Sequence, residues 1–456
     1  MLRYADVMQR VVLRLKRQGI VRRAMLPFLG LPGAHQAAFG ATLAILISYS
    51  ASLVLGFGLS GSQGNRIATG LLLFGLPLLL FLLSFRNGLR IQPPDFIFAG
   101  FLVAVLLSFV LNPVEPNSTK EHLLLVASIA GYLACRPMVA EDAAVVRSAF
   151  ERVTAVIVLV GAVFTAAEIF NQWDGPPGRP LVLGFNAAGT YFMMSLGFLI
   201  LALVTVDEPR PKRTAAISAL IFLPTVIFAA AMVRFTFIAL AGSLFVAMIL
   251  AERGKRWHVV AIGFTIFLAV VVGLSARHKT AMMYAGYAVE KTAEVRTAAS
   301  EMPSCSLTVN MRNSIAIRKA LARDAIYLLP TAGLVGTGLD SFMRFSCIKA
   351  HQVHISILQA TVEFGWLGGI SFVLLIGAAL YRLFLVSKHN GAVRFILCSL
   401  VFAVLLSLAH GRISRDSTLF ALIGCAVGVS DFRRRKCDDA MSFSDHGNQR
   451  ASPSHV

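Results

Sequence analysis

The sequence is dominated by long apolar runs that recur along most of its length. Each run spans roughly 17–25 residues, which is enough for a helix to cross ~30 Å of hydrocarbon. No water is available inside a bilayer to pair backbone polar groups, so apolar runs of this length must be helical there. Of the 456 residues, 57% are hydrophobic and 14% are charged, whereas soluble domains carry roughly a quarter charged residues. The pattern therefore predicts an all-α, polytopic integral membrane protein.

We expect about twelve transmembrane helices. Their approximate ranges are 37–59, 67–85, 96–112, 119–135, 150–171, 186–206, 214–232, 234–251, 257–275, 356–386, 393–410 and 417–431. The segments on the same side of the membrane as the N-terminus carry clusters of basic residues, such as Arg433–Lys436. The connections on the opposite side mostly carry one basic residue each, and the last of them carries Arg412 and Arg415. Positive charge marks the cytoplasmic side, so both termini are predicted to be cytoplasmic.

The formal net charge of +19 follows from this placement of Arg and Lys between the apolar runs. Basic residues that read nucleic acid gather on one face or stand among aromatic residues, and neither pattern is present here. We therefore expect anionic membrane lipid as a partner and no nucleic acid.

The topology divides the chain into five segments. They are a basic cytoplasmic segment (1–36), transmembrane helices 1–9 (37–275), a large periplasmic loop that contains helices (276–353), transmembrane helices 10–12 (354–431) and a disordered cytoplasmic tail (432–456). A loop this long between membrane helices is usually functional or disordered. Helical periodicity within it favours a function.

Two cysteines, Cys305 and Cys347, fall in this loop. In the oxidising periplasm they could form a disulfide, and the alternative is a pair of thiols. The sequence leaves both states open.

The loop contains a predicted helix at 311–329. Arg312, Lys319 and Arg323 recur on one of its faces at helical spacing, and Ile326 lies on the neighbouring apolar arc with Ile315, Ala322 and Leu329. The basic face is either simply solvated or presents cations to a ligand at the membrane surface. A glycine-rich turn follows at 333–338, and because no strand precedes it, we expect a tightly packed turn rather than a nucleotide site.

Two histidines, His351 and His354, stand at the mouth of the tenth predicted helix. A neutral imidazole can accept a proton from a hydroxyl group, so either histidine is a candidate general base. Glu363 lies deeper in the same helix, where a carboxylate is costly unless it is paired, and it is a candidate supporting residue. The His and Cys residues show no zinc-like spacing, so no metal is expected.

Arg234 lies at the outer mouth of a tight hairpin between two apolar runs. A guanidinium near hydrocarbon is costly unless it reaches the interface or finds an anion. Arg234 therefore either extends toward water or offers a fork for a phosphate group.

In this order, these features resemble the O-antigen ligase and O-antigen polymerase superfamily of bacterial membrane glycan transferases. The resemblance covers roughly 183–424, from Leu183–Gly184–Phe185–Asn186 through Arg234, Arg312 and the glycine-rich turn to His354 and the following Gly-x-x-Gly. It implies a metal-independent inner-membrane enzyme without a cofactor. Such an enzyme transfers a glycan from undecaprenyl diphosphate to a saccharide hydroxyl, such as one of the lipid A core.

The resemblance also implies roles for individual residues. Arg234 and Arg312 would bind the donor diphosphate, with Arg318 and Lys319 as further candidates, and His354 would activate the acceptor hydroxyl. Glu363 and Asn186 would support them. His351 remains the alternative base.

Two other functions stay open. A polysaccharide polymerase would use the same chemistry with a second lipid-linked glycan as acceptor. A transporter or flippase of the lipid-linked glycan would also need cations, but along a pathway through the membrane. The predicted helices carry no run of charges midway along their length, which disfavours a transporter.

Overall fold

The computed structural model describes residues 71–86, 89–112, 119–138, 142–173, 178, 180–182, 188–232, 234–289, 313–348 and 351–430. Every secondary-structure element within these ranges is a helix. The segment 1–36, the first predicted run at 37–59 and the tail at 432–456 lie outside them.

The helices follow the apolar runs. In chain order they are α5 (Leu76–Arg86), α6 (Pro93–Leu111), α7 (Thr119–Cys135), α8 (Ala143–Asn171), α9 (Ala188–Val204), α10 (Pro211–Ala230), α11 (Arg234–Leu250), α12 (Arg253–Ala276), α13 (His278–Val289), α14 (Ser314–Leu328), α15 (Phe342–Phe345), α16 (Ser356–Val386) and α17 (Gly391–His410). A further apolar helix covers Ser417–Ser430. A short π-helix, η1 (Leu71–Gly75), precedes α5. Single 3₁₀ turns lie at Leu329–Thr331 (η3), Ser387–His389 (η4) and Ile413–Arg415 (η5).

Six of these helices are long and apolar enough to cross a membrane, namely α6, α8, α10, α12, α16 and α17. Four shorter apolar helices of 10–17 residues fall where the sequence predicts further spans. They are Glu121–Cys135, Gly189–Val204, Phe235–Leu250 and Ser417–Ser430.

The candidate spans differ in how much of their surface the protein covers. In α12, 28% of the span is buried, and large apolar side chains such as Phe264 and Phe267 are exposed. In α17, by contrast, 72% is buried. Exposed apolar faces on the outer helices are what lipid contact requires, while α17 has the environment of a central helix.

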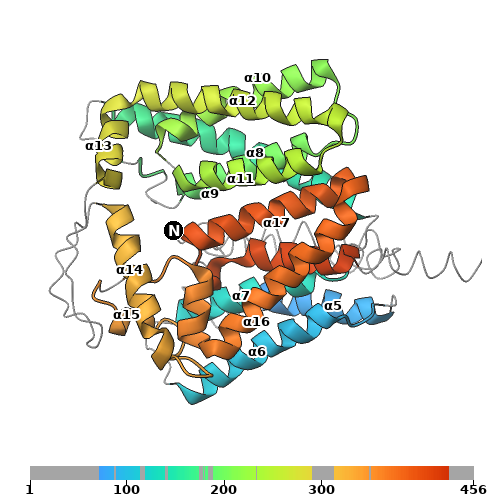
Figure 1. The fold of residues 1–456 in the computed structure, drawn as a ribbon, viewed down its shortest axis with the longest axis vertical. Coiled ribbons are helices and arrows are strands. Elements are labelled where there is room, and N and C mark those ends of the chain that lie inside the picture. Colours follow the sequence, from blue (N-terminus) through green and yellow to red (C-terminus); the bar gives the residue numbers. More distant parts are fainter. Residues whose placement is uncertain are drawn as a thin grey trace, which may run out of the picture.

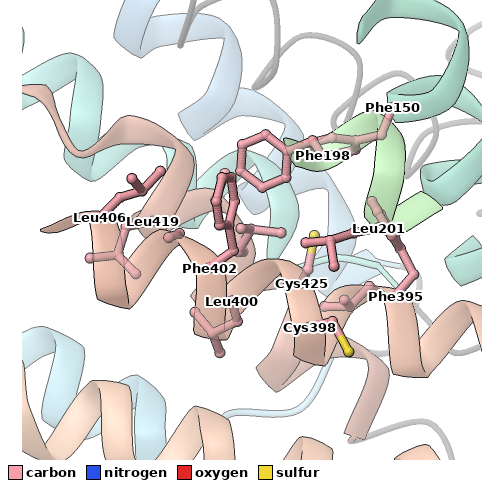
Figure 2. Close-up of a cluster of buried hydrophobic side chains, with 14 of the residues drawn as sticks. Phe150, Phe198, Leu201, Phe395, Cys398, Leu400, Phe402, Leu406, Leu419 and Cys425 are labelled. Carbon is pink, nitrogen blue, oxygen red and sulfur yellow. The ribbon is translucent and has the colours of Figure 1, made fainter. Parts of the chain in front are cut away.

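The helices form two groups, and α17 lies between them (Figure 1). One group contains α8 to α12, with α10 and α12 side by side, and the other contains α6, α7 and α16. Aromatic side chains fill the interior where α17 meets the first group, as Figure 2 shows for Phe198 and Phe402, whose rings meet edge to face with centroids 5.2 Å apart. Gly197 leaves room for this contact, because a Cβ there would lie 2.3 Å from the Phe402 ring.

The helices of the predicted loop, α13, α14 and α15, lie across one end of the bundle (Figure 1). The prediction of a helix at 311–329 is confirmed over the described residues as α14, which begins where the Asn313 side chain accepts hydrogen bonds from the amides of Ile315 and Ala316 at 3.0 and 3.2 Å. Cys305 lies outside the described residues, so the disulfide with Cys347 stays a prediction.

The predicted apolar arc of α14 is wrong except at Leu329, which packs against the buried cluster. Ile326 is 56% exposed, and the helix instead buries Ile317, Leu321 and Leu328 against Phe342 and neighbouring apolar residues. The helix has two arcs with apolar residues, and the contact with α16 decides which one is covered. Lys319 and Arg323 are exposed, as a solvated basic face would be.

Candidate functional site

The candidate site lies where the start of α16, the start of α7 and the loop 411–416 come together, and we call this region the His354 end. Its framework is a break in α16 at Gly365, which has a φ of +73°. The glycine-rich turn 333–338 fits into the break. Thr337 and Gly338 donate their amides to the carbonyls of Val362 and Glu363, each at 3.0 Å. The turn thus pairs backbone groups that the broken helix leaves open.

Two glycines make this close approach possible. A Cβ on Gly365 would lie 2.2 Å from the Leu334 carbonyl oxygen, and one on Gly336 would lie 2.3 Å from the Glu363 carbonyl carbon. Both glycines also have positive φ, which side chains disfavour. The prediction of a packed turn is confirmed, whereas the break in α16 was not expected from the sequence.

Glu363 connects three segments of the His354 end through hydrogen bonds. Its side chain is fully buried and accepts hydrogen bonds from the Asp340 amide at 3.0 Å and from Gln359 Nε2 at 2.9 Å. The Oε1 atom of Gln359 in turn accepts the Ile413 amide at 2.9 Å. Glu363 therefore connects the turn, α16 and the loop 411–416, which fits the supporting role expected for it.

Asp340 lies beside this carboxyl and has a left-handed φ of +69°. Gln352 donates its side-chain amide to Asp340 Oδ1, and burial raises the pKa of the Asp340 carboxyl. Gln352 is fully buried and comes directly after His351, so this contact also fixes the segment that carries both histidines.

His354 is half-buried and lies two residues before α16 begins. Burial, together with the nearby charges of Arg318, Arg412, His351 and Arg415, lowers the pKa of its imidazole to about 4. All four named neighbours are basic side chains. Neutral imidazole is the form that can accept a proton, so His354 has the protonation state that a general base needs near pH 7.

One of these cations, Arg318, comes from α14. The Arg318 guanidinium lies 4.7 Å from the centroid of the Phe235 ring, a cation–π contact. Phe235 is the second residue of α11, so the contact brings α14 to the mouth of the hairpin where Arg234 begins that helix. The Arg234 side chain, Arg312 and Asn186 lie outside the described part of the chain, and their predicted roles stay predictions.

The other cations near His354, Arg412 and Arg415, come from the loop 411–416. In the sequence these two arginines served only to predict the orientation of the chain in the membrane. Glu121, at the start of α7, pairs with both Arg412 and Arg415, with its Oε1 at 3.4 Å from Arg412 Nη1. Ser414 donates its hydroxyl to the other carboxylate oxygen at 2.5 Å. The sequence did offer one sign of this cluster. Arg412 and Arg415 are three residues apart in an outer connection, and the other outer connections mostly hold a single basic residue.

Asp416 ties the same loop to the start of α16. It accepts hydrogen bonds from the hydroxyl groups of Ser356 and Ser407, the latter at 2.7 Å. Burial raises the pKa of the Asp416 carboxyl, the two hydroxyls lower it, and the net result is a pKa of about 6. Because Ser356 is two residues from His354, the contact holds Arg412 and Arg415 near the histidine.

Within the described residues, no three His, Cys, Asp or Glu side chains gather in a way that could hold a metal ion. A comparison with protein-family models finds no match to this chain, and a comparison with curated proteins finds no similar sequence.

Proposed function

We propose that this protein is a membrane glycan transferase of the O-antigen ligase type. The donor would be a glycan linked to undecaprenyl diphosphate, and the acceptor a saccharide hydroxyl such as one of the lipid A core. The observation that carries the proposal is the environment of His354, a neutral imidazole beside several arginines at one end of an apolar helical bundle.

The proposal includes the finer topology expected from the sequence. The chain would cross the bacterial inner membrane about twelve times, with both termini cytoplasmic and with the loop 276–353 in the periplasm. The His354 end would then face the periplasm, where lipid-linked glycans are joined. The exposed apolar faces of the outer helices support a membrane location, and the loop helices across one end support a covered site there.

The reaction would use His354 as the general base. Its imidazole takes the proton of the acceptor hydroxyl while the hydroxyl oxygen bonds to the anomeric carbon of the donor sugar. The bond between that carbon and the diphosphate oxygen breaks, and undecaprenyl diphosphate leaves with the bonding electrons. Arg234, Arg312, Arg318 and Lys319 would bind the diphosphate and stabilise this negative charge.

A transfer assay with the purified protein tests the proposal. The protein is given an undecaprenyl-diphosphate oligosaccharide and lipid A core, in EDTA and without nucleotide. We expect glycan on the core, and we expect His354→Ala to reduce the rate by about 10²–10⁴-fold. His351→Ala is the matched control, and a larger loss in that variant would reassign the base to His351.

Other products would lead to other conclusions. Elongation of the donor glycan itself would identify a polymerase. Movement of the lipid-linked glycan across a liposome bilayer, without transfer to any acceptor, would replace the proposal with a transporter. A folded His354→Ala variant that transfers glycan at the wild-type rate would refute the mechanism.

A further inference from the structure

We propose that Arg412 and Arg415 form a second anion-binding site, on the acceptor side of His354, for a phosphate group carried by the acceptor. This inference rests on the proposed function and adds the chemical class of the second substrate. The donor site and this site would hold two anionic substrates beside one base.

The first support is the geometry of the two arginines. Arg412 immediately precedes the 3₁₀ turn Ile413–Arg415, and the Arg415 amide donates to the Arg412 carbonyl at 2.8 Å. Residues three apart lie on the same face of such a turn. The two guanidinium groups therefore point the same way and meet at Glu121. Paired guanidinium groups of this kind suit the oxygens of a phosphate.

The second support is their incomplete charge compensation. Two guanidinium groups share the single Glu121 carboxylate, and the Nε of Arg412 is buried without a hydrogen-bond partner among the described residues. Burial and the charge of Arg415 lower the pKa of Arg412. Arg415 is 34% exposed, so it can reach a ligand from its present position.

The nearby carboxyl groups do not complete the pairing. Glu363 faces Gln359 and the Asp340 amide, and the Asp340 carboxyl faces Gln352. Asp416 accepts hydrogen bonds from two serine hydroxyls. These acids influence Arg412 through space, but Glu121 is the carboxylate that contacts the arginines in the described residues.

The third support is the rigid attachment of the loop. Gln359 accepts the Ile413 amide at 2.9 Å, and Ser128 of α7 donates its hydroxyl to the Ser414 carbonyl at 2.9 Å. A Cβ on Gly411 would lie 2.2 Å from Ser356 Oγ, so the loop also packs closely on α16. Fixed donors bind an anion at a smaller entropic cost than flexible ones.

The fourth support is the position of the site relative to the donor cations. Arg318 comes from α14 and contacts α11, whereas Arg412 and Arg415 come from the loop after α17 and contact α7. The hydrogen bond from Ser356 to Asp416 holds the loop with Arg412 and Arg415 next to the segment that carries His354. The charges of all three arginines lower the pKa of His354. An attacking hydroxyl must approach the base from a side that the donor does not occupy. The α7 side offers cations for that second substrate.

Phosphate on the acceptor could come from two sources. In a ligase it would be a phosphate on the core saccharide, and in a polymerase it would be the diphosphate of a second lipid-linked glycan. The experiment uses three acceptors: phosphorylated lipid A core, the same core after phosphatase treatment, and an undecaprenyl-diphosphate oligosaccharide. The variants are Arg412→Gln and Arg415→Gln. Arg323→Gln is the control, because Arg323 is 45% exposed on α14 and pairs with Asp324.

We expect Arg412→Gln and Arg415→Gln to raise the KM for the phosphorylated acceptor about tenfold or more, since each removes a charged hydrogen-bond donor. The donor KM, the kcat at saturating acceptor and the KM for the dephosphorylated core should stay near wild type. If the dependence appears with the lipid diphosphate alone, the phosphate belongs to a second lipid-linked glycan. Equal effects on phosphorylated and dephosphorylated cores would overturn the inference while the transferase proposal stands.

A binding measurement keeps the inference testable if transfer fails. Each acceptor is titrated into the detergent-solubilised protein without donor. Weaker binding of a phosphorylated acceptor in the Arg415→Gln variant than in Arg323→Gln would support the site even if the proposed reaction is wrong. Unchanged binding in both variants would refute it.

Discussion

Helix α7 meets an acid–arginine cluster at each of its ends, and the two clusters differ in how completely their charges are matched. At its start, Glu121 faces two arginines, Arg412 and Arg415, that are 20% and 34% exposed. Directly after its end, Arg136 faces Asp95 and is 1% exposed. We call this second region the Arg136 end.

The Arg136 end is fully paired within a compact network. Nε and Nη2 of Arg136 each lie 2.8 Å from one oxygen of Asp95, and Tyr132 donates its hydroxyl to the same carboxylate at 2.6 Å. Asp95 also caps the start of α6 by accepting the Gln92 amide. One acid with one buried arginine fixes the junction of α6 and α7. At the His354 end, Glu121 is shared by two partly exposed arginines. These arginines can therefore bind an anionic ligand in addition to Glu121.

The largest effect on stability is expected from Arg136→Ala. Removing the arginine leaves the Asp95 carboxylate uncompensated, and breaking a buried pair in this way costs about 3–5 kcal/mol. The thermal unfolding midpoint in detergent measures the loss. Lys255→Ala is the control, because its pair with Glu252 is exposed and is worth less than about 1 kcal/mol. Equal losses in both variants would show that the Arg136 pair is not the stabilising element.

At the His354 end, stability should depend on the backbone rather than on ion pairs. Gly365→Ala would place a Cβ 2.2 Å from the Leu334 carbonyl oxygen at a φ of +73°, and we expect it to cost at least about 1–3 kcal/mol. Gly377→Ala is the control in the same helix, since nothing lies within 4 Å of its added Cβ. The control should unfold at or slightly above the wild-type temperature, and a similar loss in both would remove the special role of the break.

Glu121→Gln should have a smaller effect than Arg136→Ala. It removes the carboxylate charge but keeps an amide oxygen that can still accept from the arginines, so we expect a loss of about 1–2 kcal/mol. The same variant should bind anions more tightly, because both guanidinium groups lose their competing carboxylate. Thermal unfolding and binding of a phosphorylated acceptor measure the two effects. A loss as large as that of Arg136→Ala would make the two ends equivalent.

The smallest stability effect is expected from Arg318→Gln, which should act on the pH profile. His354 has a pKa of about 4 and stays neutral above it, so kcat/KM should be flat near pH 5–7 and fall as pH drops through about 4. Removing the Arg318 charge raises the pKa of His354, so the acidic limb should move to higher pH. Arg323→Gln is the control, since Arg323 is exposed on the same helix and pairs with Asp324. Equal profiles in the two variants would remove Arg318 from the environment of the base.

Helix positions were predictable from the sequence where the signal is local. The predicted run 356–386 is α16, because an apolar run of that length has one way to satisfy its backbone in lipid. The break at Gly365 was not predictable in the same way. Gly365 could equally serve close helix packing, and its φ of +73° depends on the turn that enters the break.

The candidate site shows the same division. His351 and His354 were both candidates because they stand at the mouth of an apolar helix, and the family resemblance favoured His354 as the base. The contacts of Arg412 and Arg415 with Glu121 join residues about 290 positions apart. One sequence carries no pattern for such a pairing, so the two arginines were read as signs of topology alone. The buried face of α14 failed for the same reason, since its partner was unknown.

The insertion of the glycine-rich turn into α16 has a consequence for hydrogen exchange. The amides of Thr337 and Gly338 end on carbonyls of α16, and the amide of Trp366 ends on the Gly333 carbonyl at 2.9 Å. These amide protons can exchange with deuterium only when helix and turn separate. The turn should therefore exchange as slowly as the start of α16 and much more slowly than exposed loops. The turn 333–338 and α16 are therefore expected to open together, as one cooperative unit.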